Sequence, residues 1–235
     1  MMRRITFLAI ILIVLCGFAG GSLKGRLLPY ISLPPRQAIV MQTPINRGAQ
    51  NIVFDMEYPT VLGFDDESFE NELNVNIVGQ VNGAIAGAFN QAKNDPSWVF
   101  VLRVRDEVKN NQGILSLRVT NDLDNGGTGF PHTVCYNADI QKSRMLTLDD
   151  LFVSKEYRTV INGLIRKIVR NDAHYFADQF TGVSEDTAFF LAGGQLHITF
   201  GKYEIASGMT GEPDFAIPTL YIRRWIKPEY APLFW

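Results

Sequence analysis

Histidines and cysteines most often build metal sites and nucleophilic centres, and this chain has few of them. The 235 residues include His132, His174 and His197, which are far apart in the sequence, and two cysteines, Cys16 and Cys135. A zinc site needs three or four ligands brought together, usually at CxxC or helical spacing. None of these residues has such a partner, so the sequence predicts no metal site and no cofactor.

A nucleophilic centre needs a serine, threonine or cysteine held beside a base. The sequence has no G-x-S-x-G turn, and residues 126–129 (GGTG) are not followed by the lysine and serine or threonine of a phosphate loop. Cys135 lies three residues after His132 on a segment with a strand pattern, where the two side chains point to opposite faces. We therefore expect no catalytic residue of this kind, and we expect Cys135 to be a buried thiol in a strand.

Carboxylates are the remaining candidates for chemistry. Six of them cluster in the second half of the chain: Asp139, Asp149, Asp150, Glu204, Glu212 and Asp214. Because paired carboxylates can run glycoside hydrolysis, one hypothesis is a hydrolase of cell-wall polysaccharide that uses Asp139 or Glu204 with His132. Helix capping explains Asp149 and Asp150 without catalysis. The sequence does not fix the distances between the acids, so an enzyme is the alternative interpretation and not the first.

The first residues have the pattern of an export signal. Arg3 and Arg4 are followed by an uncharged run from Ile5 to Gly21 and then by Ser22. This pattern is typical of a secretory signal peptide, and the run also has the minimum length that spans a membrane. We expect residues 1–22 to be a signal peptide, or an N-terminal membrane anchor through residues 5–21. Either puts the remaining chain in the periplasm, outside the cell, or at the membrane.

The composition indicates a folded body that does not bind nucleic acid. Hydrophobic residues make up 46% of the chain, charged residues 20%, and the net charge is −2. Nucleic-acid binding needs a clustered basic surface, which an acidic balance does not favour. Cys135 is the only cysteine beyond the export segment, so an intramolecular disulfide in the exported part is excluded.

Beyond the export segment the sequence predicts a linker and one domain. Residues 23–51 contain four prolines and little periodicity, which is typical of a spacer. Residues 52–235 carry helix and strand patterns. We divide this domain into an N-terminal segment, residues 52–122, and a C-terminal segment, residues 123–235.

Two long helices are expected within the domain. Apolar residues recur every fourth position over residues 65–92, and residues 154–180 have a second apolar face. Gly79, Gly83 and Gly87 share the four-residue spacing on another face of the first helix. We expect these glycines to allow close packing of that helix against a sheet.

Short strand patterns separated by turn residues complete the fold prediction. They cover residues 52–58, 98–108, 113–122, 133–140, 189–191, 196–200 and 215–218. Hairpins that do not alternate regularly with helices favour an antiparallel sheet. The predicted fold class is therefore α+β, with a mostly antiparallel sheet packed with two long helices.

A series of short motifs resembles a known family. The motifs are Gly126-Gly127 leading to His132, Tyr136-Asn137-x-Asp139, residues 146–152 (LTLDDLF), Phe189-Phe190-Leu191, residues 203–206 (YEIA) and Phe215-x-Ile217-Pro218. In this order they resemble the extracytoplasmic C-terminal domain of RsiV-type anti-sigma factors. The same domain of mostly unknown function is also found beside PdaC-type peptidoglycan deacetylases. The resemblance covers about residues 52–228, including a companion segment that precedes the motifs.

The resemblance implies an α+β domain that works outside the cytoplasm. In the best understood member type, this domain binds lysozyme as a signal. The family more often has a compact Gly-Gly-Ala-His where this sequence has residues 126–132 (GGTGFPH), so the loop most able to touch a partner carries an insertion. The deacetylase relatives carry their chemistry in a separate domain, which this sequence does not contain.

The leading hypothesis is a non-enzymatic binding domain of the cell envelope. Its ligand is expected to be a protein of the lysozyme type, or peptidoglycan or another polysaccharide. The candidate ligand-binding residues are His132, Tyr136, Asn137, Asp139, Tyr203 and Glu204. If the N-terminal segment is retained as an anchor, only Met1 to Arg4 face the cytoplasm, so we expect no anti-sigma activity from the chain itself.

Overall fold

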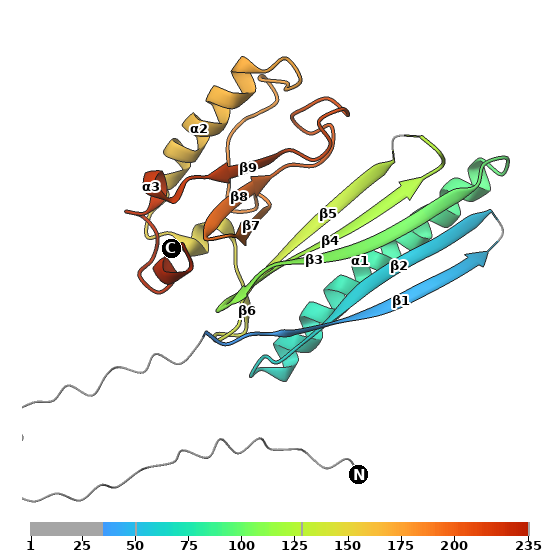
Figure 1. The fold of residues 1–235 in the computed structure, drawn as a ribbon, viewed down its shortest axis with the longest axis horizontal. Helices are drawn as coiled ribbons and strands as arrows, with labels where there is room; N and C mark the ends of the chain where they lie inside the picture. The colour runs from blue at the N-terminus through green and yellow to red at the C-terminus, as the bar shows by residue number, and fades with distance from the viewer. Residues whose placement is uncertain (1–34, 50, 128, 235) are drawn as a thin grey trace, which may run out of the picture. The chain divides into compact units, whose positions relative to one another are not determined.

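The computed structural model describes residues 35–49, 51–127 and 129–234, which form two β-sheets with helices packed against them (Figure 1). The first sheet holds six strands side by side in chain order: β1 (Ile39–Ala49), β2 (Ile52–Leu62), β3 (Phe100–Gln112), β4 (Ile114–Asp124), β5 (Phe130–Asp139) and β6 (Arg144–Met145). Neighbouring strands run antiparallel except β2 and β3, which are parallel. The prediction of an α+β fold with a mostly antiparallel sheet is confirmed.

The sheet begins earlier than the sequence indicates. Residues 39–49 belong to the expected linker, but they form β1 and pair with β2 along its whole length. A strand at the edge of a sheet tolerates Pro44, because its outer backbone groups have no strand partner. Residues 23–34 of the expected linker, and the export segment at residues 1–22, lie outside the described residues.

A single long helix connects the two parallel strands. Helix α1 (Glu67–Asn94) lies along one face of the sheet and contacts β2, β3 and β4 (Figure 1). Asp66 caps its first turn, accepting hydrogen bonds from the backbone N–H groups of Ser68 and Phe69. Of the apolar stripe with four-residue spacing, Leu73, Ile77 and Val81 are buried against the sheet as predicted, whereas Phe89 at its end is 41% exposed.

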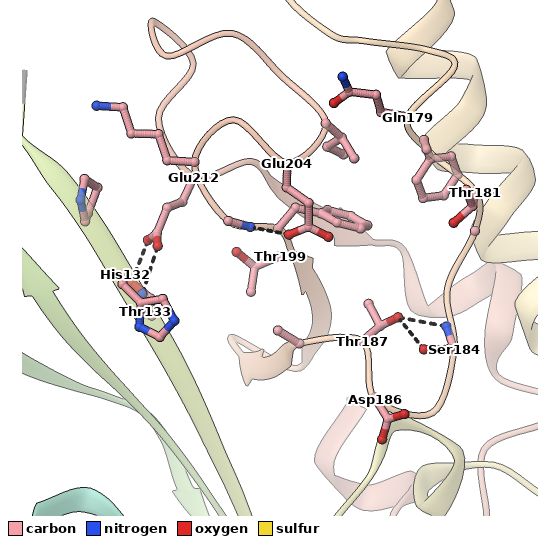
Figure 2. Close-up of a pocket in the computed structure, with 18 of the residues that line it drawn as sticks. His132, Thr133, Gln179, Thr181, Ser184, Asp186, Thr187, Thr199, Glu204 and Glu212 are labelled. Carbon is pink, nitrogen blue, oxygen red and sulfur yellow. Dashed lines mark hydrogen bonds between the residues drawn. The ribbon is translucent and has the colours of Figure 1, made fainter. Parts of the chain in front are cut away.

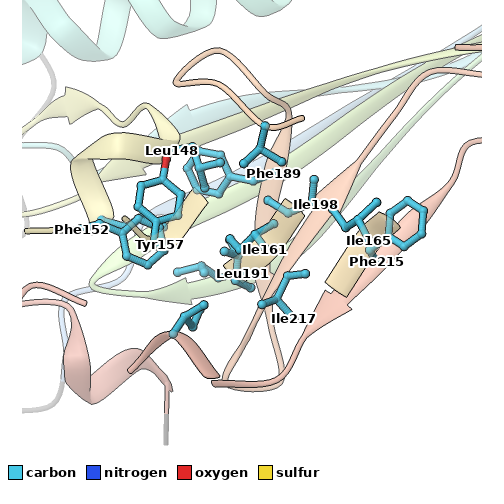
Figure 3. Packing of buried hydrophobic residues seen from close by; sticks show 14 of the residues in the cluster. Leu148, Phe152, Tyr157, Ile161, Ile165, Phe189, Leu191, Ile198, Phe215 and Ile217 are labelled. Atoms are coloured by element: carbon cyan, nitrogen blue, oxygen red, sulfur yellow. The ribbon is translucent and has the colours of Figure 1, made fainter. Parts of the chain in front are cut away.

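The other elements build a second, smaller layer. They are η1 (Leu148–Leu151), α2 (Tyr157–Asn171), the antiparallel strands β7 (Phe189–Ala192), β8 (Gln195–Thr199) and β9 (Asp214–Ile217), α3 (Thr219–Ile222) and η2 (Ala231–Phe234). Figure 3 shows their core, in which Tyr157 and Ile161 of α2 pack with Leu191, Ile198 and other side chains of the second sheet.

The expectation of two long helices is not confirmed. Helix α1 has 28 residues, but α2 has 15 and ends at Asn171, and α3 has four. Residues 172–180, which were expected to continue the second helix, run as turns and irregular chain. Within the described ranges, none of the helices combines the length and apolar character needed to cross a membrane.

Strand β4 faces both cores. Its residues Leu115 and Leu117 belong to the cluster under α1, whereas Ile114 belongs to the cluster of the second layer. Successive side chains of a strand point to opposite faces, so a strand buried on both sides is apolar without alternation. The sequence Ile114-Leu115-Ser116-Leu117 has this pattern, and all four residues are buried.

Candidate functional site

A polar cavity of about 590 Å³ lies between β5 and the irregular segments of the second layer (Figure 2). One wall is the start of β5, and the other is formed by residues 179–188 and 199–205. The polar side chains that line it include His132, Thr133, Gln179, Thr181, Ser184, Asp186, Thr187, Thr199, Lys202, Glu204 and Glu212. The volume falls in the range of small-ligand sites, or of sites that receive a few side chains of a partner.

Glu212 fixes the loop before β9 to the β5 wall. One of its carboxylate oxygens accepts a hydrogen bond from the Thr133 backbone N–H at 3.0 Å, and the other from the Thr133 hydroxyl at 2.5 Å. Arg118 adds an ion pair to Glu212 at 3.6 Å. Because both oxygens are already bonded, Glu212 acts as a positioning residue for the cavity wall.

Two aromatic rings form a tilted pair beside the cavity. The rings of Phe130 and Tyr203 lie 5.4 Å apart between centroids, and their side chains are 65% and 44% exposed. Tyr203 has a left-handed backbone with φ of 68°, and a Cβ at Gly208 would overlap its ring. Lys202 donates to the Gly129 carbonyl and lies over both rings. Exposed, pre-positioned aromatics are typical contact residues at recognition sites.

Two carboxylates of the cavity can still bind a ligand. Glu204 accepts one hydrogen bond, from the Gly201 backbone N–H at 2.7 Å, which leaves its second oxygen available. Asp186 forms no hydrogen bond or ion pair with another described residue, and it is exposed. Nearby, the Thr187 hydroxyl accepts from the Ser184 backbone N–H. The cavity therefore offers acceptors to a basic or hydroxyl-rich ligand.

The structure brings only part of the predicted site together. His132 and Glu204 line the cavity, and the ring of Tyr203 packs against Phe130, which also lines it. The loop expected to touch a partner, residues 126–132, is shorter in the structure, because β5 already begins at Phe130.

Tyr136 faces α1 and not the cavity. It is 7% exposed, and its hydroxyl donates to the Gln80 side chain at 3.0 Å. Burial raises the pKa of Tyr136 to about 12. Its place in the core under α1 makes it a packing residue.

Asn137 and Asp139 are buried where the two layers meet. The Asn137 amide accepts from the Ser116 hydroxyl at 2.6 Å and donates to the Phe189 carbonyl at 2.7 Å. Asp139 accepts from the Tyr230 hydroxyl and from the backbone N–H groups that follow it at 141 and 142. Neither residue lines the cavity. Their buried hydrogen bonds make both of them structural residues.

The structure brings together only one of the two pairs in the hydrolase hypothesis. His132 and Glu204 line one cavity without a hydrogen bond between them, whereas Asp139 is 4% exposed, bonded to Tyr230 and absent from the cavity lining. Among the described residues, no group of three or more histidines, cysteines and carboxylates is placed to hold a metal ion.

Cys135 lies in β5, beside the cavity wall, as a partly buried free thiol. Burial raises the pKa of Cys135 to about 11. At neutral pH this thiol is protonated, and the thiolate is the reactive form. Its position and its pKa make it a structural residue.

Residues 149–219 match a family described as a protein of unknown function, DUF3298. The anti-sigma-V factor RsiV of Bacillus subtilis strain 168 is 24% identical over 179 residues, which are 70% of this chain and 62% of that protein. This chain therefore spans less than two thirds of the length of that curated relative. The resemblance to RsiV predicted from the sequence motifs is confirmed.

Solved structures of DUF3298 proteins share the fold. A member from Bacteroides fragilis NCTC 9343 has a TM-score of 0.63 and 14% identity, and the match covers 84% of this chain and 97% of that one. A DUF3298 protein from Pseudomonas aeruginosa PAO1 has a TM-score of 0.58 and 16% identity, with 85% and 97% covered. At this low sequence identity the two structures support only the fold of this chain.

Proposed function

We propose that this RsiV-like chain is a non-enzymatic binding domain of the cell envelope, and that its ligand enters the cavity between β5 and residues 179–188. The observation that supports this most is the combination of the Phe130–Tyr203 aromatic pair with unpaired carboxylate oxygens at a 590 Å³ cavity. Such a combination suits recognition, because the aromatic rings bury apolar area and the carboxylates fix orientation.

The ligand that best fits this chemistry is a basic protein of the lysozyme type, which the resemblance also implies. A lysine or arginine projecting into the cavity would meet Asp186 and the free oxygen of Glu204. Charge-assisted hydrogen bonds to carboxylates are stronger than neutral ones, particularly for the bidentate guanidinium group. A polysaccharide would donate hydrogen bonds to the same carboxylates from its hydroxyl groups, but these bonds would lack the added strength of charge assistance.

Charge reversal at the cavity tests the proposal. Binding of the full chain to hen lysozyme is measured by biolayer interferometry for wild type, Asp186→Lys and Asp178→Lys. Both substitutions change the net charge equally, but Asp178 does not line the cavity. We expect Asp186→Lys to weaken binding about tenfold, which corresponds to about 1.4 kcal/mol, and Asp178→Lys to leave it within twofold.

A second pair of variants tests the aromatic pair. Phe130→Ala removes an exposed ring of the Phe130–Tyr203 pair, whereas Trp98→Ala removes an exposed ring elsewhere. Only the first should weaken binding. Retention of the chain on purified peptidoglycan but not on lysozyme would show that the ligand is a glycan and not a protein. Retention on neither, or equal losses in the paired variants, would refute the cavity as the binding site.

We further propose that the domain functions outside the cytoplasm, delivered by residues 1–22 as a signal peptide or anchor. The support is the basic, apolar and small-residue pattern of that segment together with the RsiV resemblance. Added protease should degrade the domain in cells whose outer layers have been removed but whose cytoplasmic membrane is intact. A domain that is protected until the membrane is lysed would contradict the proposal.

A further inference from the structure

The glycine face of α1 is not packed against anything in the described structure. A Cβ built on Gly79, Gly83 or Gly87 would meet no atom within 4 Å. The expectation that these glycines permit close packing of the helix against the sheet is therefore wrong. Glycine weakens a helix interior relative to alanine, and here no steric contact within the described residues requires it.

These glycines open a groove of about 450 Å³ between α1 and the sheet, with a mostly apolar lining. Leu102 of β3 and Leu123 of β4 contribute apolar side chains, and Phe130 and His132 of β5 line the groove and the polar cavity alike. Figure 1 shows α1 lying along β3 and β4, which both contact the helix. The groove is thus a separate space that adjoins the cavity at β5.

A buried polar group without a partner lines this groove. Asn121 is 8% exposed, and its side-chain oxygen has no hydrogen-bond partner among the described residues. It lies on the same face of β4 as Val119 and Leu123, which belong to the core under α1 or pack against it. Leaving a buried acceptor unpaired is costly, so a donor from outside the described residues is the natural partner.

We propose that the α1 groove binds an elongated apolar molecule with one hydrogen-bond donor, such as an alkyl chain ending in an amide. The first and last of these glycines are eight residues apart, about 12 Å along the helix, which suits a chain of about eight to ten carbons. The volume is that of a small-ligand site and is too small for a second helix, which is about 10 Å across. The ligand's N–H bonds the Asn121 oxygen, and its alkyl chain takes the space left by the missing Cβ atoms.

Filling the groove tests this site without unfolding the helix. Decanamide is titrated into the full chain by calorimetry, for wild type, Gly83→Leu and Gly163→Leu. Gly163 is an exposed glycine of α2, also with nothing within 4 Å of an added Cβ. We expect Gly83→Leu to weaken binding at least tenfold and Gly163→Leu to leave it within twofold. Both variants should melt at or above the wild-type temperature, because leucine favours helix.

The donor requirement is tested with a second ligand and a second variant. Methyl decanoate has the same chain but no N–H, so it should bind the wild type several-fold more weakly than decanamide. Asn121→Ala should abolish that difference. Absence of decanamide binding at its solubility limit, or equal binding to Gly83→Leu and wild type, would overturn the proposal. Loss of lysozyme binding in Gly83→Leu without decanamide binding to the wild type would assign the groove to the protein ligand instead.

Discussion

Asn137 connects the two sheets through both ends of one side-chain amide. Its oxygen accepts from Ser116 on β4, and its nitrogen donates to the Phe189 carbonyl on β7. The Ser116 hydroxyl also accepts from the Leu191 backbone N–H at 3.0 Å. A buried hydrogen-bond network stabilises the fold only when every polar group in it is bonded. Removal of one side chain therefore leaves the other groups without a hydrogen-bond partner.

We therefore predict that Asn137→Ala destabilises the fold. The change leaves the buried Phe189 carbonyl without its partner, at a cost of about 1–3 kcal/mol. Urea unfolding followed by circular dichroism measures this loss. Asn90→Ala, at an exposed asparagine of α1, is the matched control and should change stability by less than about 0.5 kcal/mol. Equal stability of the two variants would show that the network contributes nothing.

The candidate residues show what motifs alone can predict. Glu204 and His132 line the cavity, whereas Tyr136, Asn137 and Asp139 are structural. Four of the candidates, His132, Tyr136, Asn137 and Asp139, belong to β5. The pairing register with β4 determines which face of the sheet each of these side chains occupies. The polarity of a side chain and its position in a motif do not predict that register. They therefore could not distinguish residues that line the cavity from residues that lie in the core.

At the scale of elements, Asp149 ties η1 to α2. Its carboxylate accepts hydrogen bonds from the Tyr157 hydroxyl at 2.5 Å and from the Arg158 guanidinium at 2.6 Å. The capping role expected for both acids of this turn holds only for Asp150, which accepts from the Thr147 backbone N–H. Burial acts to raise the pKa of Asp149, but the bonds from Arg158 and Tyr157 outweigh it and lower the pKa.

This lowered pKa predicts a pH dependence of stability. A carboxyl whose pKa is lower in the folded than in the unfolded chain stabilises the fold above its unfolded value, near 4. The stabilisation is lost as the pH falls through the folded value. Asp149→Asn should therefore cost about 1.5–3 kcal/mol at pH 7, and progressively less below about pH 4. Urea unfolding of wild type and variant at several pH values measures the difference.

The exposed Asp178 provides the control for this prediction. Asp178→Asn changes the same functional group without removing a hydrogen bond to another described residue, so its effect on stability should be small throughout the pH range. An Asp149→Asn cost that stays constant from pH 7 to pH 3 would show that the charge of Asp149 does not stabilise the folded state.

Elements with strong local signals were predictable, and those set by tertiary pairing were not. The Asp66 cap and the apolar stripe indicated α1 within two residues at either end. In contrast, β1 contains Pro44 and follows Pro34 and Pro35 in the sequence, and only the pairing with β2 defines it as a strand. The second helix was predicted nine residues too long, because apolar residues such as Tyr175 continue its pattern although they pack on the second sheet.

At the scale of the whole described unit, two hydrophobic clusters share one strand. Leu115 and Leu117 of β4 lie in the cluster under α1, and Ile114 lies in the cluster that contains Leu191. The buried Ser116–Asn137 network crosses between them. If one hydrophobic cluster unfolds, the shared strand β4 loses its cover on that face, and apolar surface next to the other cluster becomes exposed. This coupling favours a single cooperative unfolding transition.

Hydrogen exchange of a core variant tests this cooperativity. Leu191→Ala empties a site that is 2% exposed in the second cluster and should cost about 2–5 kcal/mol. If the two clusters unfold together, the slowest amides of α1 and of β8 should lose protection by the same factor, as measured by mass spectrometry. Leu220→Ala, at a leucine that is 66% exposed, should leave both unchanged. Faster exchange in β8 with unchanged protection in α1 would mean that the layers open separately.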